Sequence, residues 1–263
     1  MENLQGRTIL VTRSKKSKGA FSEQIRKAGG NPVEVPLLQF AIRDTMENNQ
    51  MINGLHDYNW VFFTSINGVE FFFELWNKHK KSWPANVKLA AVGEKTGNAL
   101  LGQGINVDFV PDTFSASNMA DQFLKRYPEP GRILLVRGNL SRPTLPEVFR
   151  QQRVFFQTMT VYDTLPVEDQ QASLIPFLER GLLDAYTFTS PSTISAFHNI
   201  CCSHKDYHRF LLKPCVCIGP TTASEAEKTG FSNVLTPPSN YTIEGMIEVM
   251  ERYFKQKGQD ING

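Results

Sequence analysis

Short apolar runs alternate with longer amphipathic stretches along the whole of this 263-residue sequence. That alternation is typical of βα units, in which apolar strands form a parallel sheet and amphipathic helices cover it. We expect strands at residues 8–12, 32–37, 60–64, 88–92, 108–110, 133–137, 155–162, 185–189, 215–218 and 233–235. Helices are expected in most of the gaps, and Gly29, Gly104 and Gly230 stand where helices should end.

The chain also repeats itself in four matched blocks. FTSINGVEFF matches FTSPSTISAF, AVGEKTGNALLGQGI matches CIGPTTASEAEKTGF, FSASNMADQF matches YTIEGMIEVM, and GRTILVTR matches GRILLVRG. Each block lies about 125 residues before its partner, and the blocks keep one order. A general likeness between βα units is the alternative explanation. The repeat predicts an α/β fold of two similar lobes, each a parallel sheet wrapped by helices, with the working site between them.

The two copies need not be divided at the middle of the chain. Each copy opens with strand, helix and strand, over residues 6–38 and 131–164. The second strand runs on into an extended, proline-marked segment, VPLLQF near residues 33–40 and TVYDTLP near residues 158–166. Such segments suit connectors between lobes, but periodicity leaves open whether the copies are sequential or interleaved.

Composition narrows the class of protein. Hydrophobic residues make up 41% of the chain and charged residues 21%, which predicts a folded core, and the net charge of +2 argues against a dedicated nucleic-acid binder. The N-terminal segment leads directly into a strand-like run without the pattern of a secretory signal, and no apolar run approaches the ~20 residues that cross a bilayer. The cysteines at 201, 202, 215 and 217 lack zinc-ligand spacing and suit core packing. We therefore expect a cytoplasmic protein.

Hydroxyl, amide and glycine residues gather where the expected strands end. Ligands bind beyond the carboxyl ends of parallel strands, and the free N–H groups of the following helices favour carboxylates or phosphates there. Ordinary helix capping is the alternative role of each of these residues. The candidate substrate-binding residues are Thr12, Arg13, Thr64, Ser65, Asn67, Gly68, Thr96, Phe114, Ser115, Arg137, Gly138, Ser190, Ser192, Gly219, Thr221, Thr222, Tyr241 and Thr242.

Motifs for other chemistry are missing. The sequence has neither the G-x-x-x-x-G-K-[ST] loop nor the G-x-G-x-x-G turn that bind nucleotides, and no G-x-S-x-G nucleophile elbow. Its five histidines lack metal-ligand spacing, and Asp and Glu are scarce at the strand ends. The sequence therefore predicts a site of hydroxyls, backbone amides and one or two arginines, without a metal or a cofactor.

Tyr162 lies on the connector segment TVYDT, at the expected junction between the lobes. A phenol can donate a proton to a leaving hydroxyl, or only a hydrogen bond. An amphipathic aromatic side chain that packs at the junction is the other interpretation. Both interpretations stay open from the residue alone.

Taken together, these residues resemble the uroporphyrinogen-III synthase family. The motifs that carry the resemblance cover nearly the whole chain in the family's order. They are VTR at 11–13, FTSINGV at 63–69, AVGEKT at 91–96, PDTFSA at 111–116, LLVRGNLSRPTLPE at 134–147, TVYDT at 160–164, FTSPST at 188–193, CIGPTTA at 217–223 and YTIEGM at 241–246. Each motif is weak by itself, but the ordered set is specific.

The resemblance implies an interleaved chain. Residues 1–37 and 167–263 would form one flavodoxin-like lobe and residues 38–166 the other, joined by two extended connector strands. It also implies an enzyme that takes hydroxymethylbilane, removes water, inverts the last pyrrole ring and closes the macrocycle to uroporphyrinogen III, without a metal or an organic cofactor. The expected partner is this polycarboxylate substrate, with no nucleic acid or membrane, and the expected state is a monomer.

The resemblance also assigns roles to residues. The family's proposed acid tyrosine falls on Tyr162, and its cleft threonines fall on Thr96 and Thr222. Binding roles fall on Ser65, Asn67, Ser115, Arg137, Ser190 and Ser192. The second half has FTSPST where the first has FTSINGV, so the halves cannot bind identically. Lys95, beside Thr96, receives no role.

Two other functions stay open. One is a non-enzymatic, two-lobed binding protein for an anionic metabolite, which would share the fold but not the reaction. The other is a glycosyl- or phosphoryl-transferring enzyme with a cleft between two lobes. The missing phosphate loop and the missing carboxylate pair make this last class a poorer fit.

Overall fold

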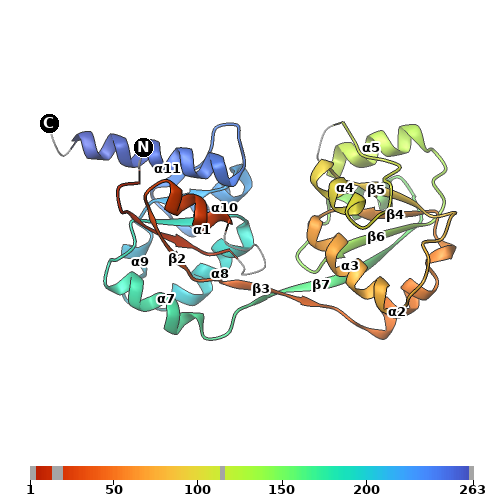
Figure 1. Ribbon diagram of the computed structural model, residues 1–263, viewed down its shortest axis with the longest axis horizontal. Helices are drawn as coiled ribbons and strands as arrows, with labels where there is room; N and C mark the ends of the chain where they lie inside the picture. Colours follow the sequence, from red (N-terminus) through yellow and green to blue (C-terminus); the bar gives the residue numbers. More distant parts are fainter. Residues whose placement is uncertain (1–3, 14–19, 113–115, 261–263) are drawn as a thin grey trace. The chain divides into compact units, whose positions relative to one another are not determined.

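The computed structural model describes residues 4–13, 20–112 and 116–260, which form two compact α/β units (Figure 1). The first unit is made of Met1–Gln39 and Leu165–Gly263, and the second of Phe40–Thr164. The chain begins the first unit, builds the whole of the second, and then returns to complete the first. The second unit is therefore an insertion within the first.

The first unit contains a five-stranded sheet in the order β10-β9-β8-β1-β2. Neighbouring strands are parallel throughout. The strands are β1 (Thr8–Val11), β2 (Asn31–Glu34), β8 (Ala185–Phe188), β9 (Cys215–Cys217) and β10 (Val234–Leu235). The helices are α1 (Ala20–Lys27), α7 (Gln170–Glu179), α8 (Pro191–Cys201), α9 (Tyr207–Phe210), α10 (Pro220–Thr229) and α11 (Ile243–Asp260).

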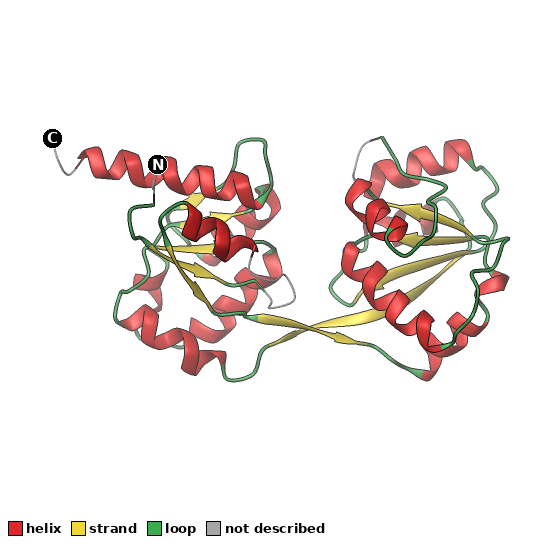
Figure 2. Cartoon of the chain, viewed as in Figure 1, coloured by secondary structure: helices red, strands yellow, loops and turns green. Residues whose placement is uncertain are grey.

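Alternate side chains of these strands enter two different cores, one on each face of the sheet. Leu10 and Tyr186 pack with Phe197 of α8 on one face. Ile9 packs with Met250 of α11 on the other. Because successive side chains of a strand point to opposite faces, apolar runs such as TILV predict strands that are covered on both sides. Helices accordingly lie on both faces of the sheet (Figure 2).

The second unit repeats this arrangement with a sheet in the order β3-β7-β6-β4-β5. The strands are β3 (Leu38–Ile42), β4 (Trp60–Phe63), β5 (Lys88–Ala91), β6 (Ile133–Gly138) and β7 (Phe156–Pro166). The helices are α2 (Met46–Asn53), the 3₁₀ helix η2 (Leu55–Asp57), α3 (Ile66–Lys78), α4 (Glu94–Leu101), α5 (Ala116–Arg126) and α6 (Thr144–Gln151). On β4, Phe63 faces the core of α3, and Phe62 faces the core of α5 and α6.

The two sheets share one strand order, which confirms the prediction of two similar lobes. Strands β9, β8, β1 and β2 of the first unit correspond to β5, β4, β6 and β7 of the second. The FTSPST segment follows β8, and the FTSINGV segment follows β4, so the repeated motifs occupy equivalent places. The expected strand at 108–110 is reduced to a single parallel bridge between Ala90 and Phe109, where the first unit has β10.

Strands β3 and β7 are the extended connectors that the sequence predicted. They are neighbours in the second sheet, and each crosses a boundary between the units. The N–H of Arg43 donates to the carbonyl of Val161, and the N–H of Val167 donates to the carbonyl of Leu37. Residue numbers rise along one strand as they fall along the other, so this pair is antiparallel.

One boundary differs from the sequence-based expectation. The expected strand at 32–37 is β2, which ends at Glu34, and a separate strand, β3, begins at Leu38. Pro36 lies in the gap and has no N–H to donate to a sheet. The equivalent residue of the second unit is Val161; β7 continues through it, although the pairing of β7 with β6 skips this residue.

Three glycines lie where the sequence predicts helix ends. Gly29, Gly104 and Gly230 follow helices with positive φ angles of 80°, 79° and 101°, as their helix-ending role requires.

All four cysteines are free thiols, and three of them are buried. None of the helices in the described part of the chain is long and apolar enough to cross a membrane.

Candidate functional site

The candidate residues lie at the edge of each sheet where its parallel strands end. In the second unit this edge carries Thr64, Ser65, Asn67, Gly68, Thr96, Arg137, Gly138 and Tyr162. In the first unit the corresponding edge carries Thr12, Arg13, Ser190, Ser192, Gly219, Thr221, Thr222, Tyr241 and Thr242. Phe114 and Ser115 lie outside the described residues. Parallel pairing thus gathers the candidates into two groups, one on each unit.

The phenol of Tyr162 is held by two rings of its own unit. It stacks on Phe71 with ring centroids 5.1 Å apart and meets Phe40 edge-on at 5.5 Å. The residue is only 8% exposed. Its hydroxyl makes no hydrogen bond within the described residues, yet it is not among their buried polar atoms without a partner. The hydroxyl therefore reaches solvent and is free to donate to a ligand.

Arg137 lies near the end of β6, beside the strand that carries Tyr162. Its guanidinium donates a hydrogen bond to the carbonyl of Ser141, and no carboxylate of the described chain forms an ion pair with it. Burial, and to a smaller extent the neighbouring Arg150, lowers the pKa of Arg137 from its ordinary value. A half-buried cation without a counter-ion gains strongly from a carboxylate ligand, because the ligand supplies the missing charge and accepts its hydrogen bonds.

Two helices of the second unit begin at this edge. Ser65 caps α3, and its Oγ accepts the N–H of Gly68 at 3.0 Å. Gly93 stands at the same place before α4 but provides no side-chain cap. Thr96, in the first turn of α4, is 7% exposed, and its hydroxyl has no hydrogen-bond partner among the described residues. The open N–H groups and this hydroxyl can bind an anionic oxygen.

The first unit has matching helix starts. Ser190 caps α8, where its Oγ accepts the N–H of Thr193 at 3.4 Å and lies 2.9 Å from the Oγ of Ser192. Gly219 precedes α10 without a side-chain cap, as Gly93 precedes α4. Thr222 is 3% exposed, and its hydroxyl also lacks a partner among the described residues. The serines Ser65 and Ser190 are thus helix caps. The hydroxyls of the buried threonines Thr96 and Thr222 have no partner among the described residues.

Tyr241 and Thr242 lie beside these helix starts. The ring of Tyr241 lies close to Gly219, since a Cβ added to that glycine would be 3.3 Å from Cγ of the ring. Tyr241 is 49% exposed, so much of its ring can meet a ligand. The Oγ1 of Thr242 accepts the N–H of Gly245 at 3.2 Å, in the first turn of α11. Thr242 is therefore a helix cap.

Thr12 and Arg13 differ in how far their polar groups are already used. The hydroxyl of Thr12 donates to the carbonyl of Thr187 at 2.7 Å, and Thr187 returns a bond to the carbonyl of Leu10, all within the buried contact between β1 and β8. Arg13 makes no ion pair among the described residues, and burial lowers the pKa of its guanidinium. Arg13 can thus bind an anion, whereas the hydroxyl of Thr12 joins two strands.

Two residues that the sequence-based candidate set omits belong to the same edge. Asn139 and Ser141 form hydrogen bonds to the backbone around Tyr162 and Gly138. Their signal in the sequence is the segment GNLS directly after an expected strand, which is a typical turn composition. Capping patterns could not single them out because no helix begins at either residue.

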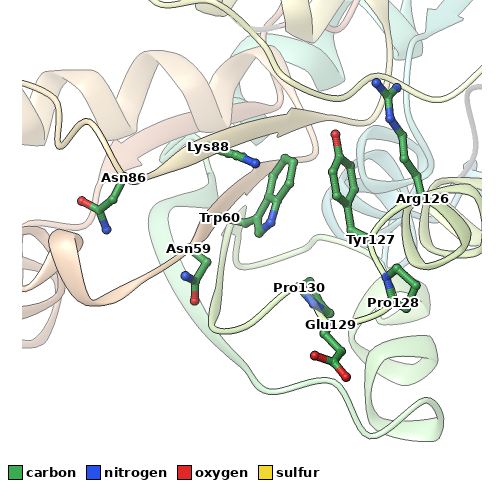
Figure 3. A pocket seen from close by; sticks show the side chains of 9 residues that line it. All are labelled: Asn59, Trp60, Asn86, Lys88, Arg126, Tyr127, Pro128, Glu129 and Pro130. Atoms are coloured by element: carbon green, nitrogen blue, oxygen red, sulfur yellow. The ribbon is translucent and has the colours of Figure 1, made fainter.

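A pocket of about 630 Å³ opens at the opposite edge of the second sheet, where β4 and β5 begin (Figure 3). The ammonium group of Lys88 lies 5.5 Å from the ring of Trp60 and 5.7 Å from that of Tyr127, and the guanidinium of Arg126 lies 5.6 Å from the Tyr127 ring. Both cations are thus already engaged with rings of the chain. Trp60 is only 3% exposed, so it offers little stacking surface. We assign this pocket no role.

Metal binding has no obvious place in the part of the chain that the structure describes. There, no three His, Cys, Asp or Glu side chains lie close enough together to hold a metal ion. The groups at the two sheet edges are hydroxyls, backbone amides and arginines, which bind anions rather than metal cations.

Comparison with known sequences points to one family. The family described as Uroporphyrinogen-III synthase HemD matches residues 19–248. The porphyrin biosynthesis protein HemD of Ruminiclostridium josui is 30% identical over 248 residues; the match covers 93% of this chain and 48% of that protein, so this chain spans about half of that relative. The uroporphyrinogen-III synthase of Synechococcus elongatus is 26% identical, over 96% of this chain and 97% of its own.

Solved structures show the same fold at lower sequence identity. A mutant uroporphyrinogen III synthase from Thermus thermophilus matches with a TM-score of 0.68 and 18% identity, covering 95% of this chain and 100% of that one. The uroporphyrinogen-III synthetase of Helicobacter pylori matches with a TM-score of 0.62 and 17% identity, over 94% and 99%. The family match over most of the sequence, together with this fold, shows that the chain belongs to the uroporphyrinogen-III synthase family, the cyclising lyases of porphyrin biosynthesis.

Proposed function

We propose that this chain itself catalyses the uroporphyrinogen-III synthase reaction, the conversion of hydroxymethylbilane into uroporphyrinogen III and water. The observation that carries the proposal is the hydroxyl of Tyr162, which makes no hydrogen bond within the described residues and whose ring is held by Phe40 and Phe71. Arg137, which has no ion pair there, lies on the neighbouring strand at the same sheet edge. A proton donor and a cation at one edge suit a substrate that loses a hydroxyl and carries carboxylates. Family membership supports the choice of this substrate.

Loss of water is the first step of the proposed reaction. The electron pair of the pyrrole nitrogen expels the substrate's hydroxyl as the C–O bond breaks, and Tyr162 donates the proton that makes the leaving group water. The product of this step is an azafulvene cation. Because the pyrrole nitrogen already drives the departure, the acid has a moderate task, which a phenol can perform.

Ring inversion and closure follow. The azafulvene carbon is attacked by the substituted carbon of the last pyrrole ring, giving a spiro intermediate, which breaks and recloses with that ring inverted. A proton leaves the last ring on closure and balances the proton that Tyr162 donated. Without an enzyme the chain closes to the uninverted isomer. The main task of the protein is therefore to hold a flexible polycarboxylate in one shape.

The groups at the two sheet edges suit that task. Arg13 and Arg137 have no ion pair within the described residues, and the starts of α4 and α10 offer backbone N–H groups without side-chain caps. Each can bind one carboxylate of the substrate through charge-assisted hydrogen bonds. We further propose that the two units act as the two lobes of the enzyme, and that it works as a cytoplasmic monomer.

The direct test is to incubate the protein with freshly made hydroxymethylbilane and to separate the uroporphyrin isomers after oxidation. Isomer III above the level of the uncatalysed control supports the proposal. Binding of hydroxymethylbilane with only the uninverted isomer formed would instead identify a binding protein for an anionic metabolite.

Substitution of Tyr162 by Phe tests the proton donor. Tyr162→Phe keeps the ring and its contacts with Phe40 and Phe71, and removes only a hydroxyl that makes no internal hydrogen bond. We expect kcat to fall about 10–100-fold, the lower part of the range for acid catalysis, because the pyrrole nitrogen assists the departure. Full activity of Tyr162→Phe combined with inactivity of Tyr162→Ala would mean that the ring serves packing.

A further inference from the structure

We propose that Gly138 and Asn139, at the end of β6, are positioning residues that hold the hydroxyl of Tyr162 at the sheet edge. Gly138 leaves the space in which the phenol lies, and Asn139 fixes the strand that carries it. This inference rests on the proposed function in one respect, because the proposed function makes the Tyr162 hydroxyl a proton donor. The geometry that carries it belongs to the second unit alone.

The space at Gly138 is filled by the phenol. A Cβ added to Gly138 would lie 2.3 Å from Cζ, 2.6 Å from Cε2 and 2.7 Å from the hydroxyl oxygen of Tyr162. Such distances are far below van der Waals contact, so any other residue at position 138 must displace the ring. Gly138 does not have a positive φ angle. The site therefore needs glycine for room rather than for backbone conformation.

The ring cannot move aside easily. It stacks on Phe71 and meets Phe40 edge-on, and it belongs to the buried core of the second unit. Close-packed interiors relax only partly when an atom is added, so displacement would force the neighbouring rings to move or the phenol to leave its place. In either case the hydroxyl would leave its present position at the edge.

Asn139 forms hydrogen bonds with β7 at Tyr162 and at Thr164. Its backbone N–H donates to the carbonyl of Tyr162 at 3.1 Å. Its side-chain oxygen accepts the N–H of Thr164 at 2.8 Å, and its side-chain nitrogen reaches the carbonyl of Thr164 at 3.4 Å. The carboxamide thus replaces a neighbouring strand beyond the register shift between Arg137 and Gly138. It restrains β7 two residues after Tyr162.

The turn that carries Gly138 is closed by its own hydrogen bonds. The N–H of Gly138 donates to Oγ of Ser141 at 3.0 Å, and its carbonyl accepts the N–H of Ser141 at 3.2 Å. The N–H of Gly138 is therefore not available to a substrate. A positioning role fits Gly138 better than the substrate-binding role that the sequence suggested.

The first unit shows that the shared fold does not require this glycine. In the matched blocks GRTILVTR and GRILLVRG, the residue equivalent to Gly138 is Arg13. The residue equivalent to Tyr162 is Leu37, whose N–H donates to the carbonyl of Thr12. The large side chain of Arg13 is tolerated at its position because Leu37 is part of the core and places no polar group at the sheet edge. Gly138 and Tyr162 thus occur together in the second unit, where the hydroxyl of Tyr162 reaches solvent.

The test compares Gly138→Ala with Gly54→Ala, a control in the same unit whose added Cβ would make an ordinary contact of 3.4 Å. We expect Gly138→Ala to lower kcat about 10–100-fold with KM changed less than about threefold, as loss of a positioned acid would do. Asn139→Ala should lower kcat less, because the ring keeps its space. Gly54→Ala should keep wild-type kinetics.

Two further measurements separate positioning from instability and from failure of the proposed function. In a Tyr162→Phe background, Gly138→Ala should change kcat less than about twofold, because the hydroxyl it positions is gone. A 3-fluorotyrosine label at position 162 should give a ¹⁹F resonance that Gly138→Ala shifts and Gly54→Ala does not. An unshifted resonance, or an equal loss of kcat in both backgrounds, would overturn the inference. If wild-type protein makes no isomer III, the proposed function fails while the ¹⁹F result still decides the geometry.

Discussion

The same junction is built twice in this chain and used in two ways. In the first unit, just beyond the ends of β1 and β2, the N–H of Leu37 donates to the carbonyl of Thr12. In the second unit, Tyr162 of β7 pairs with Gly138 of β6, the residue after Arg137. The register is the same up to this point, since Val11 pairs with Glu34 as Val136 pairs with Met159. The repeat therefore places four different side chains at two equivalent positions.

The two junctions differ in which polar groups remain available to a ligand. The first junction keeps none for a ligand, because Leu37 is fully buried and the hydroxyl of Thr12 donates to a carbonyl of β8. The second junction keeps two, since the hydroxyl of Tyr162 and the guanidinium of Arg137 lack partners that would neutralise or saturate them. A duplicated scaffold supplies equivalent positions, and the residue at each position decides whether it serves stability or a site.

The largest expected effect is a difference in the free energy of unfolding between variants of Leu37 and of Tyr162. Leu37→Ala should lower the free energy of unfolding of its unit by about 2–5 kcal/mol, because it leaves a cavity in a close-packed core. Tyr162→Phe should change it by less than about 0.5 kcal/mol, since no internal hydrogen bond is lost. Urea unfolding followed by tyrosine and tryptophan fluorescence measures both. Similar losses in the two variants would show that the junctions do not differ in this way.

A second pair of glycines sharpens the comparison. Gly6 and Gly131 precede the equivalent strands β1 and β6 with φ angles of 75° and 74°. A Cβ added at Gly6 meets nothing within 4 Å, whereas one at Gly131 would lie 2.1 Å from Oδ1 of Asn59. Each alanine substitution should cost about 1–2 kcal/mol for its left-handed backbone.

Gly131→Ala should lose a further ~1–3 kcal/mol of unfolding free energy through the clash with Asn59. Thermal unfolding of the two variants side by side measures the difference. Replacing Asn59 by Ala in the Gly131→Ala variant should recover part of it. Equal losses at Gly6 and Gly131 would mean that the clash relaxes without cost.

The smallest effect distinguishes Thr12 from Arg137. Thr12→Val should lower the unfolding free energy by about 1–2 kcal/mol, because the buried carbonyl of Thr187 loses its donor, and should leave KM unchanged. Arg137→Gln should change stability little and raise KM about 3–10-fold, with a weaker dependence on salt than the wild type. Kinetics at two ionic strengths test this. An unchanged KM in Arg137→Gln would remove this residue from the site.

Much of the fold could be predicted from the sequence because its signals are local or repeated. Apolar runs gave the strands, and the blocks about 125 residues apart gave the two similar units. Ser65 and Ser190 could be recognised as caps, since a cap bonds within its own first turn. The break at Pro36 was less visible, because the run around it is apolar and extended on both sides.

The candidate site could be predicted from the sequence only in part. Thr12 and Thr96 look alike in the sequence, as threonines that follow apolar strands. The structure gives the hydroxyl of Thr12 an acceptor on Thr187 and leaves that of Thr96 without a partner. The acceptor is 175 residues away along the chain, so no local pattern contains it.

By itself, the sequence determined the class of fold, the repeat and the chemical types of side chain at each sheet edge, because these follow from local periodicity and composition. Only the tertiary structure decided which of those side chains remain available. Whether a hydroxyl or a guanidinium is free depends on every group that folding brings to it, as Gly138 and Asn139 are brought to the strand of Tyr162. Such contacts join residues that are distant in the chain, and hydrogen-bond partners and packing space exist only once the chain is folded.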